Sequence, residues 1–215
     1  MLLHLRPFWV DIGVGFYWQL MAIWFVAVAL MGCSGTGPGN PKVPKGAKGS
    51  GGKHAQIETE MGNITVQFYE DDSPTAVENF RLLAENGYYD GLTFHRVVEG
   101  FMIQGGDPRG DGTGGESAWG GSFDDDINRD STLYRRGYRR GIVAMANSGP
   151  DTNGSQFFIM HGNSRLPPNY VIFGNVVEGL PVVDALASVP IARSSSGEMS
   201  RPTRPLVIRK IVVTP

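Results

Sequence analysis

Two segments of the chain combine apolar and aromatic residues with a few polar side chains that could do chemistry. They run from Phe94 to Asp107 and from Gly141 to Ile159, and glycines interrupt both of them. Their notable polar side chains are those of Arg96, Gln104, Asn147 and Gln156. That composition suits an apolar pocket in which a few aimed hydrogen-bond donors and acceptors orient a ligand. The two segments therefore predict a ligand site.

The groups that covalent or metal chemistry needs are missing from the sequence. There is no plausible nucleophile–base pair and no clustered Cys/His metal spacing, and the glycine-rich stretch 105–115 lacks the Gly-Lys-Ser/Thr ending of a phosphate loop. His95 is the strongest acid–base candidate, but it stands on a predicted strand beside Phe94, where a structural role is favoured. We therefore expect no metal and no cofactor.

Both segments closely resemble the two signature segments of the cyclophilins, the cyclosporin-binding type of peptidyl-prolyl cis-trans isomerase. The resemblance covers essentially the whole of residues 55–214. It implies an eight-stranded antiparallel β-barrel with a helix at each end. It also implies an enzyme that accelerates rotation about X–Pro bonds in proline-containing polypeptides.

The resemblance assigns roles to individual residues. Arg96 aligns with the catalytic arginine, which is placed against the prolyl nitrogen and carbonyl. The residues implied to bind the substrate are Phe101, Met102, Gln104, Ala146, Asn147, Gln156, Phe158, Leu166 and Tyr170. Arg165 stands where animal members have a tryptophan that contacts cyclosporin, and Tyr170 stands where they have a pocket-wall histidine. Both changes resemble bacterial members and put cyclosporin affinity in doubt more than catalysis.

Rotation of an X–Pro bond needs no nucleophile. One torsion crosses a barrier of about 18–20 kcal/mol, which takes tens to hundreds of seconds without a catalyst. An apolar pocket disfavours the dipolar planar amide, and a cation can hydrogen-bond the nitrogen lone pair that the twisted state frees. Such a charge-assisted bond contributes about 1.5–3 kcal/mol, or about one to two powers of ten in rate. The alternative is a proline-peptide binding module or holdase chaperone that uses the same groove without essential turnover.

The elements that must position these residues are short strands and two helices. Alternating residues over 56–68 predict a hairpin, and Ser73-Pro74 begins a helix that ends at Asn86-Gly87. A second helix is expected over 181–187, and residues 105–122 form a loop. Further strands are expected over 92–97, 102–104, 141–146, 157–160, 171–176 and 206–213. The pattern predicts a mainly β fold, a closed eight-stranded antiparallel β-barrel capped by two helices.

The first 33 residues predict export. Residues 14–31 carry no charge, and the apolar run ends at Cys33, the one cysteine of the chain. The string Leu-Met-Gly-Cys at 30–33 resembles a bacterial lipobox, so we expect a signal peptide whose removal leaves Cys33 lipidated. An uncleaved membrane helix and simple secretion are the alternatives. Each places the chain outside the cytoplasm, and the first makes it an anchored lipoprotein of the cell envelope, facing the periplasm or the exterior.

Residues 34–53 are rich in glycine, proline and lysine and have no hydrophobic period, which predicts a flexible linker. The isomerase-like domain is expected over 54–215, where 14 basic and 20 acidic residues give a net charge of −6. That balance argues against nucleic acid as a partner. The linker carries four lysines and no acid, which suits an anionic membrane surface. We expect a monomer.

Overall fold

The computed structural model describes residues 42–215, so Cys33 and the rest of the expected signal segment lie outside the described part. The chain divides into two units, residues 1–37 and 38–215, and every described residue belongs to the second. Within residues 42–215, no helix has the length and apolar character needed to cross a membrane.

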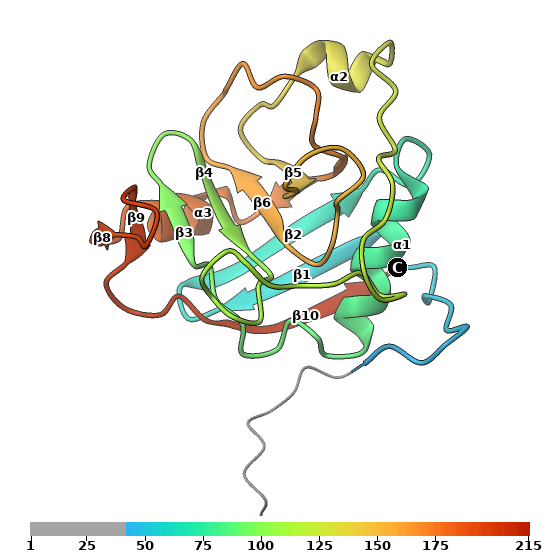
Figure 1. Cartoon of the computed structure of the whole chain (residues 1–215), viewed down its shortest axis with the longest axis horizontal. Helices are drawn as coiled ribbons and strands as arrows, with labels where there is room; N and C mark the ends of the chain where they lie inside the picture. Colours follow the sequence, from blue (N-terminus) through green and yellow to red (C-terminus); the bar gives the residue numbers. More distant parts are fainter. Residues whose placement is uncertain (1–41) are drawn as a thin grey trace, which may run out of the picture. The chain divides into compact units, whose positions relative to one another are not determined.

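Eight antiparallel strands form the main sheet, in the order β10-β1-β2-β7-β5-β6-β4-β3 (Figure 1). Their bounds are β1 His54–Thr59, β2 Gly62–Phe68, β3 Arg96–Val98, β4 Met102–Gly105, β5 Ile142–Met145, β6 Phe157–Met160, β7 Ile172–Glu178 and β10 Ile208–Thr214. A β-bridge between Thr93 and Val207 joins the chain before β3 to the chain before β10, which brings the two edges of the sheet together. The predicted mainly β, eight-stranded antiparallel architecture is confirmed.

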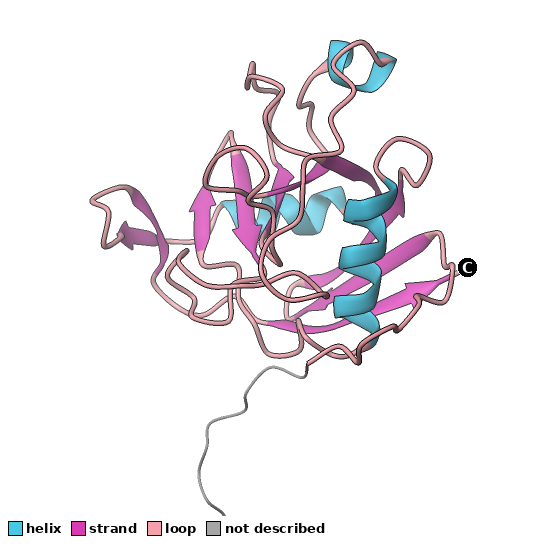
Figure 2. Ribbon diagram, turned by 45° about the vertical axis from the view of Figure 1, so that its right-hand side comes forward, coloured by secondary structure: helices cyan, strands magenta, loops and turns pink. Residues whose placement is uncertain are grey.

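Two of the three helices in the described part were predicted. They are α1 Pro74–Glu85, which contacts β10 and β7, and α3 Leu180–Ala187, which contacts β2, β3 and β4. Figure 2 shows them beside the sheet, with the short α2, Thr132–Arg136, standing apart above it. Neither α2 nor the hairpin of β8 Ile191–Arg193 and β9 Met199–Pro202 was predicted. Elements this short carry little local signal, because isolated helices of one or two turns are not stable without tertiary packing.

Two apolar clusters lie on opposite faces of the strands that carry the signature segments. The larger fills the inside of the sheet and includes Ile103, Phe157 and Ile159. The smaller lies on the other face and includes Met102 and Phe158. Because side chains alternate along a strand, neighbouring residues of β4 and β6 enter different clusters. Apart from Gln104, both strands therefore carry apolar side chains on both faces, and the smaller cluster forms the floor of the site described below.

One predicted strand is shorter than expected. The interval 92–97 was expected to be continuous, but β3 begins only at Arg96, after the isolated bridge at Thr93. The physical reason is that the interval changes partner. Its first half bonds the chain near Leu206, through Phe94 N to Leu206 O at 3.0 Å, whereas β3 pairs with β4. His95 lies at the changeover, just outside the strand on which it was expected.

Residues 42–53, the described part of the expected linker, make specific contacts with α1. The backbone N–H of Gly49 donates to Glu78 Oε1 at 2.8 Å, and that of Ser50 donates to Glu85 Oε1 at 3.0 Å. The side chain of Val43 packs against the larger core cluster. This part of the chain is therefore bound along the domain.

Candidate active site

The register of the sheet brings the first polar groups of the site together. Arg96 on β3 lies opposite Gln104 on β4, and Gln104 lies opposite Phe158 on β6. Phe158 in turn lies opposite Ala144 on β5. Directly opposed residues of paired strands point to the same face, so this row places a cation, an amide and an aromatic ring side by side.

A pocket of about 170 Å³ opens over this row. It is lined by nine of the ten residues implied above, namely Arg96, Phe101, Met102, Gln104, Ala146, Asn147, Phe158, Leu166 and Tyr170. An adjoining hollow of about 260 Å³ shares Gln104, Ala146 and Asn147 with it and is lined by Gln156, the tenth. The structure thus gathers all ten residues in one continuous groove.

The apolar part of the pocket rests on the smaller core cluster, which packs against its side chains from below. Met102 and Phe158 are almost fully buried. The ring of Tyr170 meets that of Phe158 edge to face, with centroids 5.5 Å apart. Such a wall can bind a small ring against an apolar surface with little rearrangement of the wall's own side chains.

Arg96 lies at the polar end of the pocket. Its Nη1 donates to Gln104 Oε1 at 3.2 Å, and its guanidinium lies over the Phe101 ring, 5.9 Å from the centroid. It also forms an ion pair with Glu198, from Nε to Oε2 at 2.7 Å. Hydrogen bonds from the guanidinium hold the pKa of the Glu198 carboxyl below its usual value.

A chain of amide hydrogen bonds continues from Arg96 along the groove. Gln104 Nε2 donates to Gln156 Oε1 at 2.9 Å, and Gln156 Nε2 donates to the carbonyl of Gly114 at 2.8 Å. At the other wall, Asn147 Nδ2 donates to the carbonyl of Asn169 at 2.8 Å. These bonds hold the amide side chains of Gln104, Gln156 and Asn147 in place along the groove.

Three residues that support the site were not found from the sequence: Tyr134, Tyr138 and Glu198. The hydroxyl of Tyr138 donates to the carbonyl of Tyr170 at 2.8 Å and accepts from its N–H at 3.1 Å, which fixes the pocket wall. The hydroxyl of Tyr134 accepts from the N–H of Ile172 at 2.9 Å, and burial raises its pKa to about 12. The spacing of the two tyrosines within an arginine-rich stretch was the available signal.

Two other candidates lie outside the pocket. His95 precedes Arg96 but does not line the pocket, and burial lowers the pKa of its imidazole. Arg165 is exposed and does not line the pocket, whereas its neighbour Leu166 does. Within residues 42–215 there is no group of three or more His, Cys, Asp or Glu residues placed to hold a metal ion.

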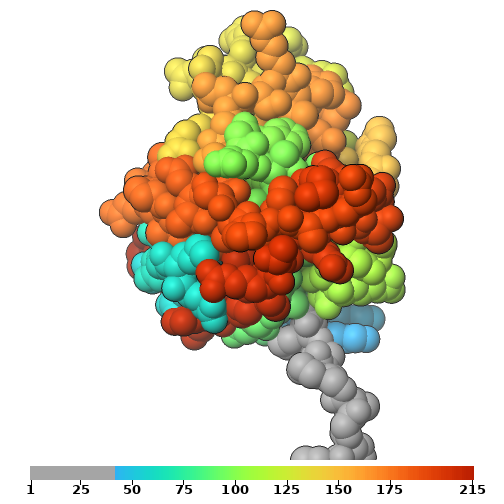
Figure 3. Space-filling view, turned by 90° about the vertical axis from the view of Figure 1, so that its left-hand side faces the viewer, coloured from blue at the N-terminus to red at the C-terminus, as the bar shows by residue number. Residues whose placement is uncertain are grey.

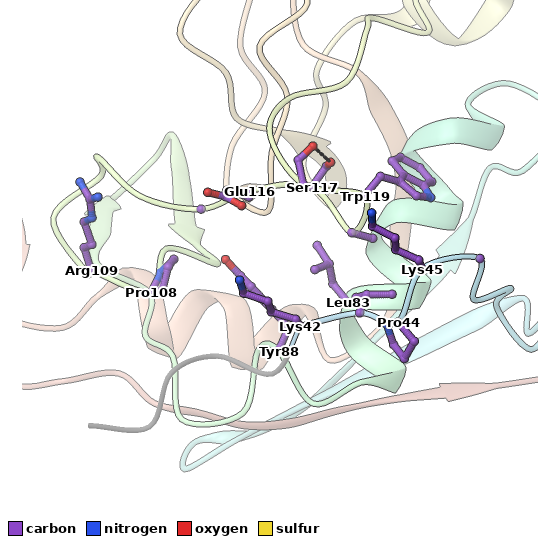
Figure 4. A pocket seen from close by; sticks show the side chains of 15 residues that line it. Lys42, Pro44, Lys45, Leu83, Tyr88, Pro108, Arg109, Glu116, Ser117 and Trp119 are labelled. Atoms are coloured by element: carbon purple, nitrogen blue, oxygen red, sulfur yellow. Dashed lines mark hydrogen bonds between the residues drawn. The ribbon is translucent and has the colours of Figure 1, made fainter. Parts of the chain in front are cut away.

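A larger cavity of about 700 Å³ lies between residues 42–46 and the loop 108–120 (Figure 4). Pro44, Leu83 and Trp119 contribute to its lining. It shares no residue with the Arg96 pocket and brings together none of the groups that the signature segments supply. Size alone therefore does not identify the site.

A sequence model described as "Cyclophilin type peptidyl-prolyl cis-trans isomerase/CLD" matches residues 54–213. The chain belongs to the cyclophilin family. Among relatives of this cyclophilin, peptidyl-prolyl cis-trans isomerase CYP18-1 of Arabidopsis thaliana is 42% identical over 158 residues, which are 73% of this chain and 93% of that protein. Human peptidyl-prolyl cis-trans isomerase-like 3 is 43% identical over 136 residues, which are 63% of this chain and 82% of that protein.

A solved structure supports the same membership. The crystal structure of a Cryptosporidium parvum cyclophilin-type isomerase is 37% identical, with a TM-score of 0.67, and covers 76% of this chain and 98% of its own. A second crystal structure of that isomerase, obtained in the presence of the dipeptide Ala-Pro, has a TM-score of 0.66 at 37% identity and covers 75% of this chain and 99% of its own.

Some relatives are much longer than this cyclophilin. Peptidyl-prolyl cis-trans isomerase CYP65 of Arabidopsis thaliana is 47% identical over 154 residues, 71% of this chain but only 25% of that protein. The relatives named here are eukaryotic. They give no support to the bacterial resemblance or to the lipoprotein expected from the N-terminal sequence.

Proposed function

We propose that the chain is a peptidyl-prolyl cis-trans isomerase that accelerates rotation of X–Pro bonds in polypeptide clients and so assists their folding. The observation that carries the proposal is one arrangement of groups, a pocket of about 170 Å³ that combines walls from Met102 and Phe158 with the guanidinium of Arg96. The Cryptosporidium parvum isomerase named above has been crystallised in the presence of Ala-Pro, and we extend that ligand class to this groove.

The mechanism follows from what this pocket favours. The prolyl ring binds against Met102 and Phe158, where the planar, dipolar amide is poorly solvated. As the bond twists, conjugation is lost and the nitrogen lone pair becomes an acceptor for a proton of Arg96. Gln104 and Gln156 hold the flanking backbone, so the rotation proceeds around a restrained peptide. No group is transferred at any step.

The first prediction concerns Arg96. Arg96→Ala should lower kcat/KM for an Ala-Pro peptide by about 10- to 100-fold, the rate equivalent of one charge-assisted hydrogen bond of about 1.5–3 kcal/mol. Arg96→Lys should also be poor, because a point charge does not reproduce the planar fork. NMR exchange spectroscopy on the full chain measures the rate, with Arg209→Ala, an exposed arginine of β10, as the matched control.

Two results would contradict this assignment. Unimpaired turnover in Arg96→Ala would remove Arg96 from the mechanism. Binding of the peptide by the wild type without acceleration would instead indicate a proline-peptide binding module or holdase.

We further propose that the clients are exported proteins and that the chain is held at a membrane through the N-terminal segment. The uncharged stretch 14–31, its end at Cys33 and the basic linker support this placement, all of them features of the sequence. Attachment through a lipid on Cys33 is the preferred form, and an uncleaved helix is the alternative. Fractionation of cells into membrane and soluble parts tests it.

A further inference from the structure

The hairpin of β8 and β9 lies beside the strand that carries Arg96. In Figure 3 the orange-red residues of this region lie next to the green turn between β3 and β4, and β9 contacts β3 directly. The hairpin loop is closed by two backbone bonds, Ser194 N to Glu198 O at 2.7 Å and Gly197 N to Ser194 O at 3.0 Å. Gly197 has φ +91°, a conformation that glycine adopts without strain. Glu198 is thus held on a defined turn.

The carboxylate of Glu198 binds one edge of the Arg96 guanidinium with both oxygens. Nε donates to Oε2 at 2.7 Å, and Nη2 donates to Oε1 at 2.9 Å. This bidentate arrangement fixes the plane of the guanidinium as well as its position. The side chains of Arg96 and Glu198 are 33% and 41% exposed, so the pair is solvated on its outer side.

The other edge of the guanidinium faces the pocket. Nη1 lies 3.2 Å from Gln104 Oε1 and 3.6 Å from the sulfur of Met102, both of which line the pocket. Glu198 itself is not a lining residue. It is therefore placed to act on a substrate through Arg96 rather than by touching the substrate.

We propose that Glu198 is a positioning residue for Arg96, and the proposal rests on the isomerase function proposed above. An arginine side chain loses about 1.5–2 kcal/mol of rotamer entropy when it is ordered. Glu198 orders it before the substrate arrives and holds Nη1, which donates to Gln104, on the side of the guanidinium that faces the pocket and the prolyl nitrogen. Such preorganisation raises the rate of the bound state more than it tightens binding.

The test is a double-mutant cycle on the full chain with the Ala-Pro exchange assay. Glu198→Ala should lower kcat about five- to tenfold and change KM less than about twofold. Glu198→Asp, which keeps the carboxylate, should recover part of the rate, and Glu198→Gln should recover less. The matched control is Glu99→Gln, an exposed glutamate of the β3–β4 turn that bonds Ser188, and it should leave the rate unchanged.

The decisive measurement introduces Glu198→Ala into the Arg96→Ala variant. If Glu198 acts through Arg96, then Arg96→Ala and the double variant Arg96→Ala/Glu198→Ala should turn over at rates within about twofold of each other. An equal loss in both backgrounds would show that Glu198 supports the fold instead. Wild-type or faster turnover in Glu198→Ala would show that the carboxylate does not position Arg96 or competes for it. Either result overturns the proposal.

The same experiment also tests the proposed isomerase function, separately from the role of Glu198. No acceleration by the wild type would contradict the isomerase itself. Full activity of Arg96→Ala would contradict the role of Arg96 before Glu198 is considered. A thermal unfolding curve for each variant identifies any loss that comes from misfolding.

Discussion

Arg96 and its neighbour His95 have opposite surroundings although they are adjacent in the chain. Arg96 is the first residue of β3 and faces the groove, where it finds Gln104 and Glu198. His95 lies at the changeover of strand partners, and burial there disfavours its charged form. The carboxylates of Asp107 and Asp111 oppose this effect and Arg96 adds to it, but burial is the largest influence on the His95 pKa.

The lowered pKa of His95 predicts a pH-dependent stability. Between the folded and the unfolded pKa, the unfolded chain binds more protons, so the free energy of unfolding rises with pH. The contribution is complete above about pH 6.5, the ordinary histidine value, and is lost as pH falls through the folded pKa. His95→Gln should therefore flatten the pH dependence of stability below pH 6.5. Denaturant unfolding of the wild type and of His95→Gln, in steps from pH 7.5 to 5, measures the free energy of unfolding. Parallel pH profiles for the two proteins would contradict the prediction.

At the scale of elements, α1 is capped by a residue from elsewhere in the chain. Ser73 stands at the N-cap, but its hydroxyl donates to the carbonyl of Ile172 at 2.7 Å. No capping box forms between Thr75 and Glu78, because Glu78 binds Gly49 and Arg81. The backbone N–H of Thr75, in the first turn of α1, instead donates to Asp126 Oδ2 at 2.9 Å. The start of α1 is therefore coupled to the loop before α2.

This coupling predicts the effect of removing the Asp126 carboxylate. Asp126→Ala should reduce the free energy of unfolding by about 1 kcal/mol, the usual contribution of an N-terminal cap. Asp126→Asn, which keeps an acceptor oxygen, should lose less. Asp124→Ala, at an exposed position in the same loop, is the control and should change stability by less than about 0.5 kcal/mol. Equal losses at both positions, measured by urea unfolding, would contradict the capping role.

At the scale of the whole molecule, the chain combines an acidic domain with a basic leading segment. Part of that segment, residues 42–53, is bound along α1 through Glu78 and Glu85. The bound part is consequently not available as free tether length between the domain and a membrane.

The membrane placement predicts a covalent change at Cys33. In the source cell, the mature chain should begin at Cys33, carry the added mass of acyl chains and sediment with membranes. Cys33→Ser should lack the added mass while residues 54–215 keep their isomerase activity, because the described lining residues of the groove all lie between positions 96 and 170. Mass spectrometry of the N-terminal peptide measures it. A chain that retains Met1 without acyl mass would favour the uncleaved helix.

The sequence alone determined most of the groove and the main elements. All ten groove residues were named from two signature segments and the stretch that follows them, through the resemblance of these segments to those of the cyclophilins. The helices α1 and α3 and the hairpin of β1 and β2 were likewise found from turn residues and periodicity. These signals are local in the chain, so they can be detected in the sequence without knowledge of the tertiary structure.

Only the tertiary structure decided the partners of those residues. Glu198 is 102 positions from Arg96, and Asp126 is 51 positions from Thr75. Local sequence carries no signal for either contact, because both depend on the order and closure of the sheet. The hairpin that carries Glu198 and the helix that carries Tyr134 are too short to be predicted from propensity, and packing against the barrel holds them in place.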